Sequence, residues 1–167
     1  MKTHQSSLNP GSMRQTENMR SGYILGDSEG ENLNHFRDHG RISIKVNKEA
    51  GCDRLALATQ QVMKGSGIPA HRHLLMDEVF YVLEGSGTFS LDSVQHPFSK
   101  GSTIFIPQNT WHAFENSDHE LLLLWVVAPA SLDGFFRETC SRAGEPAKDL
   151  TQEEIRTIAL KYGTEFR

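Results

Sequence analysis

The chain has 167 residues, of which 37% are hydrophobic and 23% charged, and its formal net charge at pH 7 is −4. This length suits one domain with a substantial core, and the chain contains no apolar run near the roughly 18–20 residues that a membrane-spanning helix needs. Lys and Arg are scattered along the sequence rather than clustered, which argues against a nucleic-acid partner.

The first twenty residues are polar and show no apolar periodicity, so we expect residues 1–20 to form a flexible tail. They also lack the basic-then-apolar pattern of an export signal, which predicts a cytoplasmic protein. Cys52 and Cys140 lie far apart in the sequence, without the CxxC spacing of redox or zinc motifs. In that compartment, two reduced thiols are a better interpretation than a disulfide.

Short apolar segments alternate with turn clusters over residues 21–130, which predicts one β domain in this range. The segments expected to form strands are 41–46, 54–63, 78–84, 87–92, 94–98, 103–106, 111–115 and 121–128. Many short strands at this spacing are typical of a barrel or sandwich. Residues 121–127 are apolar on both faces, so we expect one face to point into the barrel. A second layer or another subunit would then cover the other face.

The pattern becomes helical after residue 130, and we expect residues 131–167 to form short helices packed on the outside of the barrel. Ser131 is the expected N-cap of the first helix. Its apolar spacing comes from Leu132, Phe135, Phe136 and Thr139. Thr151 and Glu154 have the spacing of a capping box at the start of the second helix, and Gly163 is expected to end it.

Two glycine-bounded blocks carry the candidate metal site. The first runs from Gly65 to Gly85 and the second from Gly101 to Asn116. The candidate ligands in these blocks are His71, His73, Glu78 and His112. Alternate residues of an extended segment point to the same side, so His71 and His73 are expected to point inward together and Arg72 away. His112 can join them only if the strands fold into a barrel.

Three imidazoles and one carboxylate suit Fe, Mn, Co, Ni, Cu or Zn, and the absence of a thiolate disfavours a closed structural zinc site. An octahedral ion with four protein ligands keeps two positions open, and its residual positive charge favours an anionic oxygen donor. The alternative is a metal-free remnant of such a site. The other histidines fit no ligand spacing and are expected at the surface: His4, His35, His39, His96 and His119.

At these residues the chain resembles the cupin superfamily, whose motifs are G(X)5HXH(X)4E(X)6G and G(X)5PXG(X)2H(X)3N. Asn109 replaces the internal glycine of the second motif. Asn is the residue that best tolerates the left-handed conformation after glycine, so we expect the turn to survive. The resemblance implies a small jelly-roll β-barrel, a metal at the four ligands, and a homodimer. The segment 78–85 is also similar to the bacterial quercetin-dioxygenase-like group.

The favoured function is a quercetinase-like dioxygenase, an oxidoreductase that acts on an enolic or phenolic small molecule and on O₂. The substrate would chelate the metal, while Glu78 would remain a ligand or act as a general base. An apolar substrate pocket is expected from the inward strand faces: Phe80, Val82, Phe89, Ile106, Phe114 and Trp125. The alternative is that these side chains only fill the barrel.

Two other functions stay open at this point, because the cupin fold does not specify a reaction. One is an O₂-independent, metal-dependent isomerase, lyase or decarboxylase, in which the metal acts as a Lewis acid. Thr59, Gln60 and Gln61 could supply a few polar contacts to such a substrate. The other is a non-catalytic small-molecule-binding protein.

Overall fold

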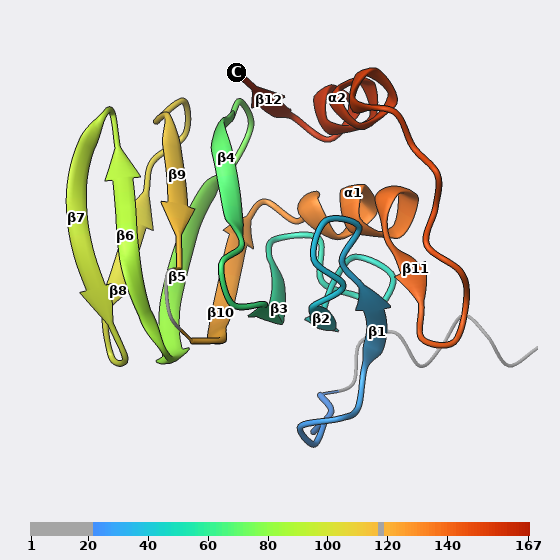
Figure 1. Cartoon of the computed structure of the whole chain (residues 1–167). Coiled ribbons are helices and arrows are strands. Elements are labelled where there is room, and N and C mark those ends of the chain that lie inside the picture. The colour runs from blue at the N-terminus through green and yellow to red at the C-terminus, as the bar shows by residue number, and fades with distance from the viewer. Residues whose placement is uncertain (1–21, 117–118) are drawn as a thin grey trace, which may run out of the picture.

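The computed structural model describes residues 22–116 and 119–167, so the expected tail at 1–20 and His4 lie outside the described residues. Within the described part, the chain forms strands β1 to β12 and two short helices, α1 and α2, near the C-terminus. The strands form two antiparallel sheets packed face to face, shown in Figure 1. The prediction of an all-β jelly roll with a short helical appendage is confirmed.

The larger sheet has seven strands, and the smaller has five. In spatial order the larger sheet contains β11 (Ser141–Arg142), β1 (Glu31–Asn34), β2 (Arg41–Val46), β3 (Ala56–Val62), β10 (Leu121–Ala128), β5 (Asp77–Glu84) and β8 (Thr103–Ile106). The smaller sheet contains β12 (Thr164–Phe166), β4 (Gly67–His73), β9 (His112–Glu115), β6 (Ser86–Leu91) and β7 (Val94–Ser99).

The core lies between the two sheets because every second residue of their central strands points inward. In β3 and β10 the buried positions alternate with half-buried ones along almost the whole strand. The rings of Phe89 and Phe114, from the smaller sheet, lie 5.9 Å apart and close to parallel. Phe80 packs against both rings from the larger sheet. This end of the sandwich is therefore filled by side chains.

The outer face of the larger sheet is only partly covered. Tyr81 on β5 is 43% exposed and Phe105 on β8 is 56% exposed. The expected homodimer would bury such residues, and it stays a prediction.

All eight expected strands are present, with bounds within two residues of those expected. Four further strands were not expected: β1, β4, β11 and β12. Strand β4 carries Gly67, Pro69 and the two histidines, so it has no hydrophobic alternation to reveal it. Strands β11 and β12 have only two and three residues, too few for any periodicity to show.

The helices begin and end close to where the sequence indicates. Helix α2 (Gln152–Lys161) starts with the expected capping box between Thr151 and Glu154, and Gly163 follows it with a φ of 73°. Helix α1 (Leu132–Thr139) has Ser131 at its N-cap, but the expected side-chain cap is absent. The Ser131 hydroxyl instead donates to the Met76 sulfur at 3.3 Å, because this end of the helix lies against the core.

The sequence suggested that helix α1 packs on the outer face of the barrel. In the structure it packs elsewhere. Its Phe136 ring stacks on Trp125, which points inward from β10, with 5.6 Å between ring centroids. Phe135 contacts both Phe136 and Phe166 of β12. Helix α1 therefore closes the open end of the sandwich, and Figure 1 shows it beside the ends of β3 and β10. Helical periodicity reveals an apolar face but not the surface on which that face packs.

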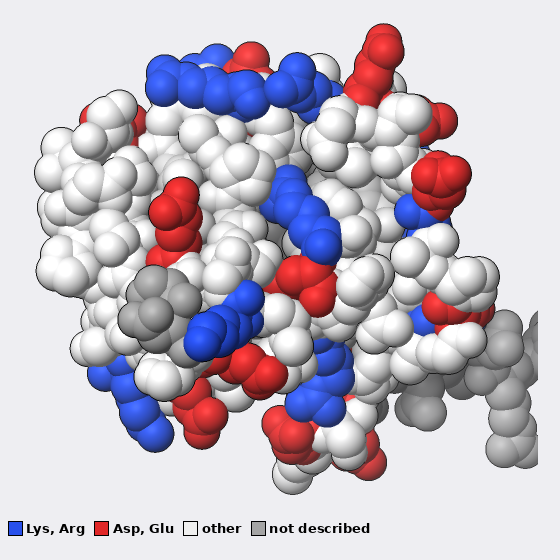
Figure 2. Space-filling model, viewed as in Figure 1, with Lys and Arg blue, Asp and Glu red and all other residues white. Residues whose placement is uncertain are grey.

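Among the described residues, no helix is both long and apolar enough to cross a membrane. Figure 2 shows that basic side chains gather along the upper edge of the viewed face, while acidic and basic side chains are interspersed over the rest. Both described cysteines are free thiols, as expected, and Cys140 is buried.

Candidate metal centre

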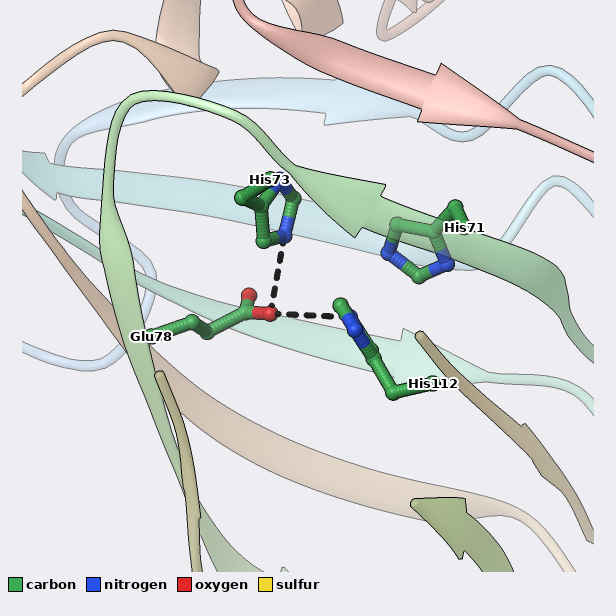
Figure 3. A group of neighbouring side chains, drawn as sticks. All are labelled: His71, His73, Glu78 and His112. Atoms are coloured by element: carbon green, nitrogen blue, oxygen red, sulfur yellow. Dashed lines mark hydrogen bonds and ion pairs between the residues drawn. The ribbon is translucent and has the colours of Figure 1, made fainter. Parts of the chain in front are cut away.

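Three strands position the four candidate ligands. His71 and His73 point inward from β4, and His112 lies opposite His71 on the neighbouring strand β9. Glu78 faces them from β5 in the other sheet. Figure 3 shows the carboxylate pointing at His73 and His112, with His71 beside them. As predicted, alternation along β4 turns Arg72 away from the centre.

The ligand atoms form a tight group in the interior. The four donor atoms all lie within 4.8 Å of one another. Glu78 Oε2 is 3.0 Å from His73 Nε2 and 3.4 Å from His112 Nε2. The exposed fractions are 5% for His71, 2% for His73 and Glu78, and 1% for His112. The sandwich therefore brings together the residues that the spacing singled out, in a group that could hold a metal ion.

Each histidine is oriented by a hydrogen bond at Nδ1, the ring nitrogen that faces away from the centre. The Nδ1 of His71 is 2.9 Å from the Pro69 carbonyl, and that of His112 is 3.0 Å from the Thr110 carbonyl. The Nδ1 of His73 is 3.0 Å from Thr164 Oγ1. A carbonyl can only accept, so Nδ1 carries the proton in His71 and His112, and their Nε2 lone pairs point to the centre. This is the usual arrangement of metal-ligating histidines.

The Nε2 of His112 is the buried atom that fits a metal best. It has no hydrogen-bond partner among the described residues, although Glu78 is close to it. An unsatisfied buried nitrogen is costly unless something coordinates it. An aligned lone pair, two more imidazoles and a carboxylate match the preferences of a divalent transition metal. These four residues therefore fit such an ion, whose identity the donor set does not specify.

The charges around the centre also favour a cation. Burial acts to raise the pKa of Glu78, but the nearby imidazoles of His73 and His112, at 3.0 and 3.4 Å from its carboxylate, outweigh burial. The pKa of this carboxyl therefore lies well below its ordinary value. Burial, with repulsion from His112 and His73, places the pKa of His71 well below 6.5. An anionic carboxylate and a neutral imidazole are the forms that bind metals.

Three of the four ligands, His71, His73 and Glu78, line a small cavity of about 30 Å³, closed on one side by α1 and β12. Its lining residues are His35, Arg37, Gln60, Ile68, His71, His73, Glu78, Phe80, Trp125, Leu132, Phe135, Phe136, Thr164 and Phe166. This space accommodates about two water molecules.

Of the six residues expected to form a substrate pocket, Phe80 and Trp125 line this cavity. Val82, Phe89, Ile106 and Phe114 do not line it and are buried in the core instead. All six side chains point inward, but an inward face runs the whole length of a strand. Only the part next to the ligands borders the cavity.

Several lining residues were not anticipated. His35 is 3% exposed and lines the cavity, so the expectation that it lies at the surface was wrong. His39, His96 and His119 are exposed, as expected. Arg37 and Thr164 also come from segments to which sequence reasoning assigned no role. They carry no local signal, because they reach the cavity through the loop after β1 and through the unexpected strand β12.

The loop that carries His35 and Arg37 is anchored by Asp38. Its carboxylate accepts hydrogen bonds from His35 Nδ1 and from the backbone N–H groups of Gly40 and Met63. Burial acts to raise the pKa of Asp38, but these bonds lower it from 3.8 to about 2. A depressed carboxyl pKa stabilises the fold above the unfolded-state value, and this contribution is lost as the pH falls toward the folded-state value.

Asp38→Asn is therefore expected to lower the free energy of unfolding by roughly 1–2 kcal/mol at pH 7. The difference from the unsubstituted protein should shrink as the pH falls from about 4 to 2, where Asp38 itself becomes protonated. Urea unfolding of both proteins at a series of pH values measures this. A difference that is the same at pH 7 and pH 3 would show that the charge of Asp38 is not the cause.

Thr164 is expected to hold His73 in the orientation that binds metal. Thr164→Val keeps the shape of the side chain but leaves the buried Nδ1 of His73 without an acceptor. We expect metal affinity to fall about tenfold, within the range known for residues that orient ligands. Competition with a chromophoric chelator measures the affinity. Thr164→Ser restores the hydroxyl and should restore affinity, so equal losses in the Val and Ser variants would contradict this role.

Comparison with known proteins agrees with the fold. The family model described as a cupin domain matches residues 58–127, a range that contains all four candidate ligands. Quercetin 2,3-dioxygenase of Bacillus subtilis is 28% identical over 115 residues, which cover 69% of this chain and 34% of that protein. An uncharacterized protein of Methanocaldococcus jannaschii is 41% identical over 61 residues, covering 36% of this chain and 49% of that protein. These matches span half or less of the relatives' own lengths.

Among solved structures, KdgF from a Halomonas species superposes with a TM-score of 0.60. The superposition covers 68% of this chain and 98% of that one, with 18% sequence identity. At this identity the likeness concerns the fold alone.

Proposed function

The chain is a member of the cupin superfamily, and on that premise we propose that it is a metal-dependent oxidoreductase of the dioxygenase type. Its substrate would be a compact enolic or phenolic molecule that coordinates the metal through oxygen. The observation that carries this proposal is the buried group of three imidazoles and one carboxylate beside a cavity. The similarity to a quercetin 2,3-dioxygenase over 69% of the chain supports it.

The residues of the centre would have two roles, which are binding of the metal ion and transfer of a proton. His71, His73 and His112 would hold the ion through Nε2. When bound, the ion would polarise a substrate oxygen and carry electron density between substrate and O₂. Glu78 would complete the ligand set, and its carboxylate would accept the proton of a substrate hydroxyl.

The walls of the cavity would exclude bulk water from this chemistry. Phe80, Trp125 and Phe136 surround the ligands with apolar surface, and α1 closes the end of the sandwich. Exclusion of water strengthens every charge interaction inside. A flavonol is much larger than a space of about 30 Å³, so it could enter only if side chains at the opening moved. A smaller enol or phenol would require less movement of these side chains than a flavonol.

An oxygen-uptake assay tests the proposal. Protein loaded separately with Fe, Mn, Co, Ni or Cu would be mixed under nitrogen with acetylacetone, a compact enolisable diketone, or with quercetin. O₂ would then be admitted. We expect O₂ consumption that requires both metal and diketone and is abolished by chelator, with quercetin turned over more slowly. Substrate loss under nitrogen, or no O₂ uptake with any metal, would contradict the proposal.

The compact cavity favours one second candidate, an O₂-independent lyase or decarboxylase that acts on a small acid. Arg37, also on the cavity wall, would suit the charge of such a substrate. The same assay separates the two, because this reaction would proceed fully under nitrogen. Reversible ligand binding without turnover in either atmosphere would instead identify a non-catalytic binding protein.

A further inference from the structure

The wall of the cavity contains a buried amide without a partner. Gln60 lies on β3, is 2% exposed, and lines the cavity. Its strand neighbours in register, Ile42 and Leu123, are apolar. Within the described residues its side chain makes no hydrogen bond, whereas the adjacent Gln61 binds Glu120 at the surface. Because Gln60 lines the cavity, a molecule held there could satisfy the donors and the acceptor of its amide.

A second unpaired donor lines the same cavity. The indole Nε1 of Trp125 is buried and has no hydrogen-bond partner among residues 22–116 and 119–167. Trp125 lies on β10, which pairs directly with the strand that carries Gln60. An indole N–H can only donate, so its partner must be an acceptor.

A positive charge completes the set. Arg37 lines the cavity, and its guanidinium carbon lies 4.8 Å from the Phe36 ring centroid and 5.2 Å from that of Phe166. It forms no ion pair within the described part of the chain, whereas Arg72 and Arg137 bind carboxylates there. Burial lowers the pKa of Arg37 from 12.5 to about 10, so the guanidinium remains charged at neutral pH. Its fork of donors matches a carboxylate.

From these three groups we propose that the cavity binds a small carboxylic acid, with its carboxylate on Arg37 and with Gln60 and Trp125 as further donors. The proposal rests on the proposed function, because a second oxygen of the acid would reach the metal. Glu78 is the one acidic residue in the lining, and it faces the histidines. The groups that line the remaining space include the Arg37 guanidinium, the Trp125 indole N–H and the Gln60 amide, a set that favours an anionic acceptor over a cationic ligand.

The arrangement separates the two ends of such a ligand. The Phe166 ring lies 5.4 Å from the His71 ring and 5.2 Å from the Arg37 guanidinium carbon, so the metal ligands and the charge both adjoin this ring. A short acid could therefore bind the metal with a hydroxyl or enol oxygen and Arg37 with its carboxylate. Ile68, Leu132 and Phe135 provide apolar contacts for a short carbon chain. The space of about 30 Å³ must widen even for a short acid, and acids with few non-hydrogen atoms require the least widening.

Calorimetric titration of metal-loaded protein with lactate, and with its neutral amide lactamide, tests this inference. We expect lactate to bind at least tenfold more tightly than lactamide. Arg37→Gln should reduce lactate affinity at least tenfold and leave metal content and lactamide affinity unchanged. Arg54→Gln is the matched control, because Arg54 is exposed and lies outside the cavity. Gln60→Leu, which removes the polar amide at similar volume, should also weaken lactate binding.

The outcomes separate this inference from the proposed function. Metal-loaded protein whose lactate affinity is the same in Arg37→Gln and Arg54→Gln would overturn the carboxylate site and leave the metal centre intact. Protein that holds no metal, but binds lactate in an Arg37-dependent way, would overturn the proposed function instead. Arg37→Lys controls for misfolding, because it keeps the positive charge but lacks the planar N–H donors of the guanidinium. Its lactate affinity should lie between those of the unsubstituted protein and Arg37→Gln. If Arg37→Lys bound lactate no more tightly than Arg37→Gln, the positive charge of Arg37 would not be the cause of lactate binding.

Discussion

Alanine at any one of His71, His73 or His112 is expected to reduce the metal content of the purified protein from about one ion per chain to near zero. Each of these imidazoles supplies one of four donor atoms that lie within 4.8 Å of one another. An ion left with three ligands in this interior would lose both a bond and the geometry that the two sheets impose. Elemental analysis after dialysis against buffer without metal measures the effect.

The fold should survive these substitutions, because Phe89 keeps its ring contacts with Phe80, Phe98 and Phe114 even when its stacking partner His112 is removed. Circular dichroism and a thermal melt of the metal-free form would verify this. His96→Ala is the matched control, since His96 is exposed on β7 of the same sheet, and His119→Ala is a second. Full metal content after substitution of all three ligands would refute the centre. Loss of metal in His96→Ala would mean that the wrong histidines had been chosen.

Glu78→Gln is expected to leave part of the metal affinity but to lower turnover by about 10²–10⁴-fold, the usual contribution of a general base. The amide has nearly the shape of the carboxylate and keeps one oxygen near His73 and His112. It carries no negative charge, so it holds a divalent ion less tightly and accepts no proton from a substrate hydroxyl. Metal content and the rate of substrate loss under saturating metal measure the two effects separately.

The matched control for Glu78→Gln is Glu84→Gln, because Glu84 lies on the same strand but is exposed at its end. This variant should keep both metal content and turnover. If Glu78→Gln lost turnover only in proportion to its loss of metal, Glu78 would be a ligand without a role in proton transfer. Turnover at the level of the unsubstituted protein, with metal saturated, would exclude it as the base.

Local patterns in the sequence were enough to predict eight strands, including those that carry Glu78 and His112, but not β4, which carries His71 and His73. The two-residue repeat of a strand sends His71 and His73 to one side, whatever the rest of the chain does. The capping box at Thr151 depends on residues three apart. Asn109 adopts a φ of 66°, as its replacement of a motif glycine required. Each of these features depends on neighbours in the sequence, so it could be predicted without the fold.

The surroundings of the metal ligands were decided only by the tertiary structure. Thr164 reaches His73, and Phe166 reaches His71, because the last residues of the described chain pair with β4 across about 90 positions of sequence. Arg37 and Gln60 come from different segments, and both line the cavity. Such contacts are set by the packing of the two sheets and by α1 closing the opening. No periodic pattern in the sequence indicates these contacts, because the residues that border the cavity come from segments far apart in the sequence. The sequence by itself therefore determined which residues could bind a metal. Only the folded chain decided how large the adjoining space is and which donors face it.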